Sequence, residues 1–158
     1  MPMKRKARGF TLVEVLIALL VLAIGLLGMA TLMMASMKSN QSSFHRNQAS
    51  TLAYDLAERM RLNRVRATTT SAYVITSSTT IPNDPGCKYS ANGCSLSDTA
   101  TMDVREWLTG LGQAGLTGTA ARTGNQYTIT VSWQEDSSAS CPRVNNVPQC
   151  SFALRVDL

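Results

Sequence analysis

An apolar run near the N-terminus constrains this chain more than any other feature. From Val15 to Ala35 no residue is charged, and only Thr31 has a polar side chain. At about 1.5 Å per residue, a helix over this run extends roughly 31 Å, about the thickness of a hydrocarbon core. A cleaved secretory signal has a shorter apolar core and a small-residue cleavage site after it, and neither holds here. The run therefore predicts a transmembrane helix that stays in the mature protein.

The basic residues ahead of this run account for most of the chain's positive charge. Lys4, Arg5, Lys6 and Arg8 are four of fifteen basic residues in a chain of formal charge +5 and pI near 9.3. Without them, eleven basic residues face ten acidic ones, which leaves +1. So small a net charge argues against a nucleic-acid partner. The basic stretch also predicts a cytoplasmic N-terminus, with the rest of the chain across the membrane.

Four cysteines lie in the C-terminal half, at Cys87, Cys94, Cys141 and Cys150. Zinc sites usually pair ligands two to four residues apart, which these spacings do not match. An even number of cysteines in polar, loop-like and exported sequence predicts disulfides, with no metal and no cofactor. Three pairings are possible. We expect Cys87–Cys94 and Cys141–Cys150, because short loops close easily.

Glu14 is the anomaly of the apolar segment. A carboxylate in a membrane helix costs about 2.5–3.5 kcal/mol at mid-bilayer, and less near the interface. Either a partner compensates this charge, or the carboxylate simply reaches the lipid headgroups.

The helix is expected to continue beyond the membrane, because no glycine or proline occurs between Ala35 and Pro82. An apolar stripe at helical period runs through Ala49, Leu52, Ala53, Leu56, Ala57 and Met60. We predict one helix over residues 10–66, with a transmembrane first half and an amphipathic second half. On its exposed side, Asp55 can pair with Arg59 and Glu58 with Arg61. We expect the cations at its end to interact favourably with the helix C-terminus: Arg59, Arg61, Arg64 and Arg66.

The remaining sequence predicts a small antiparallel sheet and a short helix. Residues 126–134 alternate apolar and polar side chains clearly, residues 151–158 do so too, and residues 117–122 form a weaker strand. The 67–101 region is rich in Ser and Thr and is expected to be a loop, with a short strand near residues 73–76. The fold class is therefore α+β, with a long N-terminal helix packed on the sheet.

Two features between the loop and the strands have local structural interpretations. An apolar repeat predicts a short helix over residues 101–111, in which Trp107 anchors the core. The glycines at 110, 112 and 115 follow this helix, so they lack the strand–helix context of a dinucleotide site. We interpret them as a glycine-rich turn.

No catalytic constellation is present in the sequence. The chain has one histidine, His45, and no nucleophile motif or metal-spaced cluster. We expect no catalytic residues, no small-molecule substrate and no enzymatic activity.

Residues 4–14, KRKARGFTLVE, resemble the class III leader of type IV prepilins and of type II secretion pseudopilins. The resemblance implies that a prepilin peptidase cuts between Gly9 and Phe10 and methylates the new amine of Phe10. It also implies that Glu14 serves assembly by pairing with the Phe10 amine of a neighbouring subunit. The expected organisation is a cleaved leader 1–9, a membrane helix 10–35, its amphipathic continuation 36–66 and a periplasmic head 67–158.

A second resemblance, over residues 40–64, is to the PilV group of minor pilins. The matching residues are Asn40, Gln41, Ser42, Ala53, Tyr54, Asp55, Ala57, Arg59, Met60, Arg61, Asn63 and Arg64. Major pilins usually have a helix-kinking proline near Thr31, and this chain has none there. The resemblance implies other minor pilins and the major pilin as partners, in a complex that initiates the pilus at its tip. A type II secretion pseudopilin is the alternative.

Overall fold

The computed structural model describes residues 9–135 and 141–158 and divides the chain into two units, one up to Gln41 and the other from Ser42 to Leu158. The predicted leader therefore lies outside the described residues, apart from Gly9. Helix α1 (Leu12–Leu62) runs through both units. It begins two residues after the predicted start.

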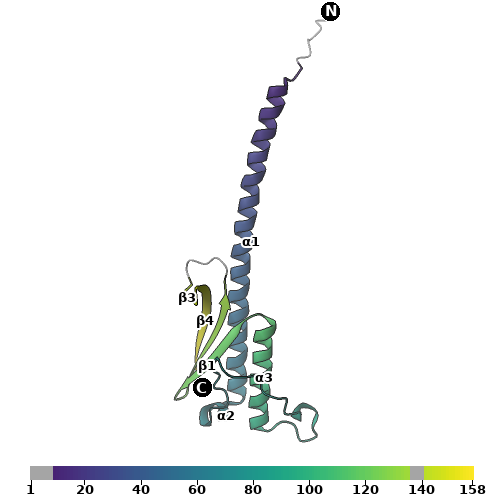
Figure 1. Ribbon diagram of the computed structural model, residues 1–158. Helices are drawn as coiled ribbons and strands as arrows, with labels where there is room; N and C mark the ends of the chain where they lie inside the picture. The colour runs from purple at the N-terminus through teal and green to yellow at the C-terminus, as the bar shows by residue number, and fades with distance from the viewer. Residues whose placement is uncertain (1–8, 136–140) are drawn as a thin grey trace, which may run out of the picture. The chain divides into compact units, whose positions relative to one another are not determined.

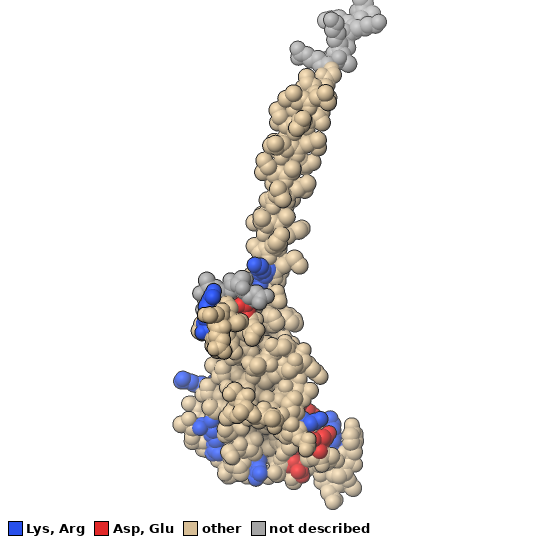
Figure 2. Space-filling model, in the orientation of Figure 1, with Lys and Arg blue, Asp and Glu red and all other residues tan. Residues whose placement is uncertain are grey.

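The first unit is the N-terminal part of α1. Every residue from Gly9 to Gln41 is exposed, and the visible face of this segment carries few charged side chains (Figure 2). Among the described residues, α1 is the one helix that is long and apolar enough to cross a membrane. Because a helix satisfies its own backbone hydrogen bonds, such an exposed apolar surface suits a lipid environment.

The predicted long helix ends earlier than residue 66. A turn at Asn63, with φ −110° and ψ 41°, separates α1 from the short helix α2 (Arg64–Thr69). The Asn63 side chain donates to the Leu96 carbonyl at 2.8 Å. Asparagine side chains that bond elsewhere compete with helical geometry, which explains the interruption.

The second unit contains a four-stranded antiparallel sheet in the order β1-β2-β4-β3. Its strands are β1 (Thr117–Thr123), β2 (Gln126–Gln134), β3 (Arg143–Val144) and β4 (Val147–Asp157). The α+β fold is confirmed, and β2 has its predicted bounds. Two predictions were incomplete: β4 begins four residues earlier than expected, and the two-residue β3 was not predicted.

The core of this unit lies where the sheet and helix α3 (Leu96–Gln113) meet the C-terminal part of α1 (Figure 1). The α1 stripe is buried as predicted, except that Leu52 remains half-buried. From β2, alternate residues complete the core: Tyr127, Ile129, Val131 and Trp133. The apolar face of α1, which has a helical period, and the apolar face of β2, which has a period of two, therefore pack in one cluster.

Trp107 of α3 is an anchor of that core, in agreement with the sequence prediction. It is 1% exposed, and its indole N–H donates to the Leu52 carbonyl at 2.8 Å. Gly118 of β1 lies directly against the ring, because a Cβ at this position would come within 2.5 Å of Trp107 Cη2. The absence of a side chain at Gly118 is therefore what lets α3 pack close to β1.

Helix α3 is longer than the predicted helix over residues 101–111. Ser95 caps it, since its hydroxyl accepts from the Asp98 N–H at 3.1 Å. The first turns are polar, so an apolar repeat could not detect them. Gly110 and Gly112 lie inside the helix, and only Gly115 occupies the turn after it, with φ 68°. The interpretation of all three glycines as a turn was wrong.

The predicted strand near residues 73–76 is a single bridge between Ile75 and Ala120 of β1. The polar hydroxyl residues on either side favour local turn bonds, such as the Thr79 hydroxyl accepting from the Thr76 N–H at 2.9 Å. A full strand therefore does not form.

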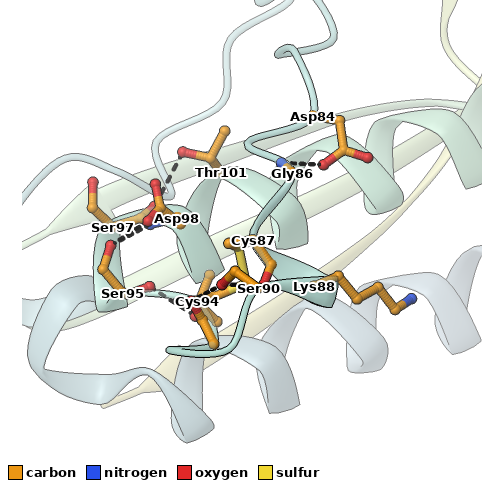
Figure 3. Close-up of a disulfide and its surroundings, with 12 residues drawn as sticks. Asp84, Gly86, Cys87, Lys88, Ser90, Cys94, Ser95, Ser97, Asp98 and Thr101 are labelled. Carbon is orange, nitrogen blue, oxygen red and sulfur yellow. Dashed lines mark hydrogen bonds between the residues drawn. A yellow bond between two sulfur atoms is a disulfide. The ribbon is translucent and has the colours of Figure 1, made fainter.

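Two disulfides join Cys87 to Cys94 and Cys141 to Cys150. The first closes a loop that precedes α3 (Figure 3). Inside it, the Ser90 hydroxyl donates to the carbonyls of Cys87 and Gly93, at 3.0 and 2.9 Å. The bridge and these bonds close the loop on itself, just ahead of α3.

Candidate assembly site

The residues singled out near the N-terminus lie at the beginning of α1. Gly9 and Phe10 precede the helix, and Phe10 is 83% exposed. A side chain added at Gly9 would meet no described residue within 4 Å. The described part of the chain thus leaves the Gly9–Phe10 peptide bond uncovered.

Glu14 occupies the first turn of α1 and takes part in an N-terminal cap that the sequence analysis missed. The Thr11 hydroxyl accepts a hydrogen bond from the Glu14 N–H at 3.3 Å. The sequence T-x-x-E at residues 11–14 is the pattern of a capping box, and it could have signalled this helix start. A carboxylate in the first turn also interacts favourably with the helix dipole.

The side chain of Glu14 nevertheless remains available. Among the described residues no hydrogen bond or ion pair to its carboxylate is present. It lies along a shallow hollow on one side of the helix, which is lined by Phe10, Glu14, Val15, Ala18, Leu19 and Leu22. This is a single carboxylate on an otherwise apolar surface, and it is suited to accept a cation from another chain.

In the second unit, the helix stretch that resembles minor pilins builds a polar network around Arg59. Its guanidinium pairs with Asp55 on the same helix at 3.0 Å. It also pairs with Asp103 at 3.2 Å and Glu106 at 2.7 Å, both on α3. Burial alone would lower the pKa of Arg59, but the hydrogen bond to Glu106 and the two aspartates hold that pKa above its usual value.

The buried side of this network reaches the α1–α2 turn. The Tyr73 hydroxyl donates to Asp103 Oδ2 at 2.5 Å, and Asn63 Nδ2 donates to the Tyr73 hydroxyl at 3.1 Å. Burial, together with the bond to Asp103, raises the pKa of Tyr73 above its ordinary range. The Asp55–Arg59 pair is confirmed, because the two residues are four apart on one helix face. The contacts of Arg59 with α3 and the bonds of Tyr73 were not predicted.

Three of the arginines lie at helix C-termini, as predicted: Arg59 and Arg61 in the last turn of α1 and Arg66 in that of α2. Arg64 instead begins α2. Arg59 also forms the network, and Arg61 pairs with Glu58 as predicted. In addition, Arg122 of β1 donates to Thr70 O at 2.6 Å and also to Thr68 O, so the sheet supplies a further cation at the end of α2.

Comparison with known families bears on both units. A model of the prokaryotic N-terminal methylation motif matches residues 4–30, which include Gly9, Phe10 and Glu14. A model of the type IV pilin Tt1218 matches residues 31–105, from α1 into α3. The chain is a type IV pilin-like protein. No curated protein and no solved structure matches it significantly.

Membership of this family has general consequences for the pilin-like chain. It implies processing by a prepilin peptidase and assembly into a pilus or pseudopilus. It points to a structural protein and away from an enzyme. The apolar helix is consistent with an inner-membrane anchor before assembly.

Proposed function

We propose that this chain is a minor pilin that helps to initiate a type IV pilus and lies at or near its tip. The main observation behind this proposal concerns Glu14. Its carboxylate is exposed and has no partner in the described chain, and it lies four residues after the exposed Phe10. Cleavage after Gly9 turns the Phe10 nitrogen into a cationic amine, which is then methylated. A neighbouring subunit's amine then pairs with Glu14.

The energetics favour this pairing inside a bundle of membrane helices. A carboxylate and an ammonium group are each costly in hydrocarbon, and they compensate each other when they meet. Removal of one partner leaves an uncompensated charge, so the pair selects the register between helices as well as their association. The rest of the hollow is apolar and packs against a neighbouring helix without further polar requirements.

The second unit supports the assignment to the PilV group. The residues on which that resemblance rests include Asp55, Arg59 and Asn63, and these build the network that joins α1 to α3. The stretch thus has a defined structural role. The lack of a proline near Thr31 favours a low-copy subunit over a bulk one. We place the head in the periplasm and then on the pilus, with a role in twitching motility or adhesion.

Replacement of Glu14 with alanine tests the assembly role. We expect the Glu14→Ala chain to be cleaved normally but to enter pili or the initiating complex about tenfold less, because the neighbouring amine loses its counter-charge. N-terminal sequencing measures cleavage, and immunoblots of sheared pili measure incorporation. Val13→Ala is the matched control, since it shortens a neighbouring side chain and leaves the carboxylate. Unchanged incorporation, pilus number and twitching in Glu14→Ala would refute the role given to Glu14.

The choice between pilus and secretion pseudopilus needs a separate experiment. A head lacking residues 1–35 is expected to recover other minor pilins in a pull-down, because the sequence resemblance to that group continues to residue 64. Mass spectrometry identifies the recovered proteins. Recovery of secretion pseudopilins in their place contradicts the assignment and favours the alternative.

A further inference from the structure

The two edges of the sheet differ in how they are covered. On the β1 side, Ala120 and Ile75 exchange backbone hydrogen bonds of 2.8 and 2.9 Å. Arg122 of the same strand binds the carbonyls of Thr68 and Thr70. The 68–76 segment therefore lies along β1 and blocks this edge.

On the β4 side, the covering strand is very short. β3 pairs only with Val147 and Pro148 of β4, and the Gln149 N–H donates to the Pro142 carbonyl at 2.8 Å. Beyond Gln149, no strand among the described residues pairs with this side of β4. β4 is the yellow strand of Figure 1, and it continues to Asp157.

In an antiparallel strand, the backbone N–H and C=O groups of successive residues point alternately to one side and to the other. The Leu158 N–H donates to the Asn125 carbonyl, so the even-numbered residues bond toward β2. The Gln149 N–H donates to Pro142 on the other side, so the odd-numbered residues point away from β2. The outward groups thus belong to Ser151, Ala153, Arg155 and Asp157. All four residues are exposed, and no described residue bonds their outward N–H or C=O groups. Such an edge is a template for another strand.

We propose that the Ser151–Asp157 edge of β4 binds an extended segment of a different protein by strand addition. Backbone bonds to the four outward residues supply the affinity, and alternate side chains supply the specificity. This inference rests on β4 and the part of α1 beside it, and it is independent of the proposed pilus function.

The side chains around the edge define the chemistry of that segment. Phe152 and Leu154 face the core yet remain half-buried, so apolar side chains opposite them complete their burial. Beside Phe152 lies a hollow of about 380 Å³ between α1 and β4, lined by Ser43, Arg46, Asn47 and Ser50. Arg46 is exposed and has no ion pair with a described residue, which favours a carboxylate in the added segment. The partner is therefore an extended segment with apolar side chains on one face and an acidic residue that reaches Arg46.

A second copy of this chain does not meet these requirements. Because its β1 edge is covered, a second copy offers only the same β4 edge, and pairing of identical edges is two-fold symmetric. In such an antiparallel contact, the second copy would present its own Phe152 and Leu154 on the face where Arg46 lies, and neither carries a carboxylate. The partner strand therefore comes from another protein.

The test uses the full chain, isotope-labelled in detergent micelles, and a short acetylated peptide in which valine alternates with threonine and aspartate. We expect binding that protects the amides of Ser151, Ala153 and Arg155 from hydrogen exchange. Ala153→Pro removes an outward N–H that no described residue accepts, so it should keep the fold and abolish binding. Ala153→Ser, which retains the N–H, is the matched control.

A reversal of charge at Arg46 tests the same proposal if the proline variant does not fold. Arg46→Glu should bind the aspartate peptide about tenfold more weakly and prefer a peptide with lysine at that place. Undiminished binding to Ala153→Pro, protection elsewhere than on β4, or no binding at all would overturn the proposal. So would protection of the same amides in the peptide-free protein on self-association.

Discussion

Replacement of Asp103 with alanine is expected to lower the free energy of unfolding of the head by about 3–5 kcal/mol. Asp103 is 8% exposed and accepts hydrogen bonds from the Tyr73 hydroxyl and from Arg59. Without it, the fully buried Tyr73 hydroxyl loses its acceptor, and the half-buried Arg59 loses its most buried counter-charge. Urea denaturation of the full chain in detergent, followed by tryptophan fluorescence, measures the change.

Glu106 provides the matched control, because it binds the same Arg59 Nη1 atom from a more exposed position. The Glu106 side chain is 40% exposed, against 12% for Asp103. Ion pairs that water screens contribute little, so we expect Glu106→Ala to cost less than about 1 kcal/mol. Equal losses for the two variants would show that burial does not decide the strength of this network.

Features with a strong local period were predictable from the sequence. The α1 stripe and the alternation of β2 each put apolar side chains on one face, and burial of that face needs no knowledge of its partner. The assembly residues were singled out for a similar reason, since Glu14 is the only charge on the apolar part of the helix.

Features that depend on distant partners were not predictable. Arg59 and Asp103 are 44 residues apart, and no local pattern indicates that α3 brings them together. The turn at Asn63, just after α1, is bonded to the Leu96 carbonyl, which is 33 residues away in sequence. β3 has only two residues and is defined by its pairing with β4. An alternation of apolar and polar residues cannot be recognised over so short a segment. The open edge of β4 follows from that shortness, and it too required the structure.

Replacement of Trp107 with alanine is expected to destabilise the head by about 3–5 kcal/mol, the usual cost of truncating a large buried aromatic residue. The ring is 1% exposed and lies against Gly118, so the cavity forms between α3 and β1, where β1 has no side chain to fill it. The Leu52 carbonyl also loses its indole donor.

Trp107→Phe separates the ring's volume from its hydrogen bond. It retains most of the apolar contact and should cost about 1–2 kcal/mol, mainly through the lost bond and the smaller ring. Denaturation followed by the fluorescence of Trp133, which is also buried, reports on both variants. If alanine costs no more than phenylalanine, the space beside Gly118 collapses on truncation. The close approach of α3 to β1 would then not depend on the indole ring.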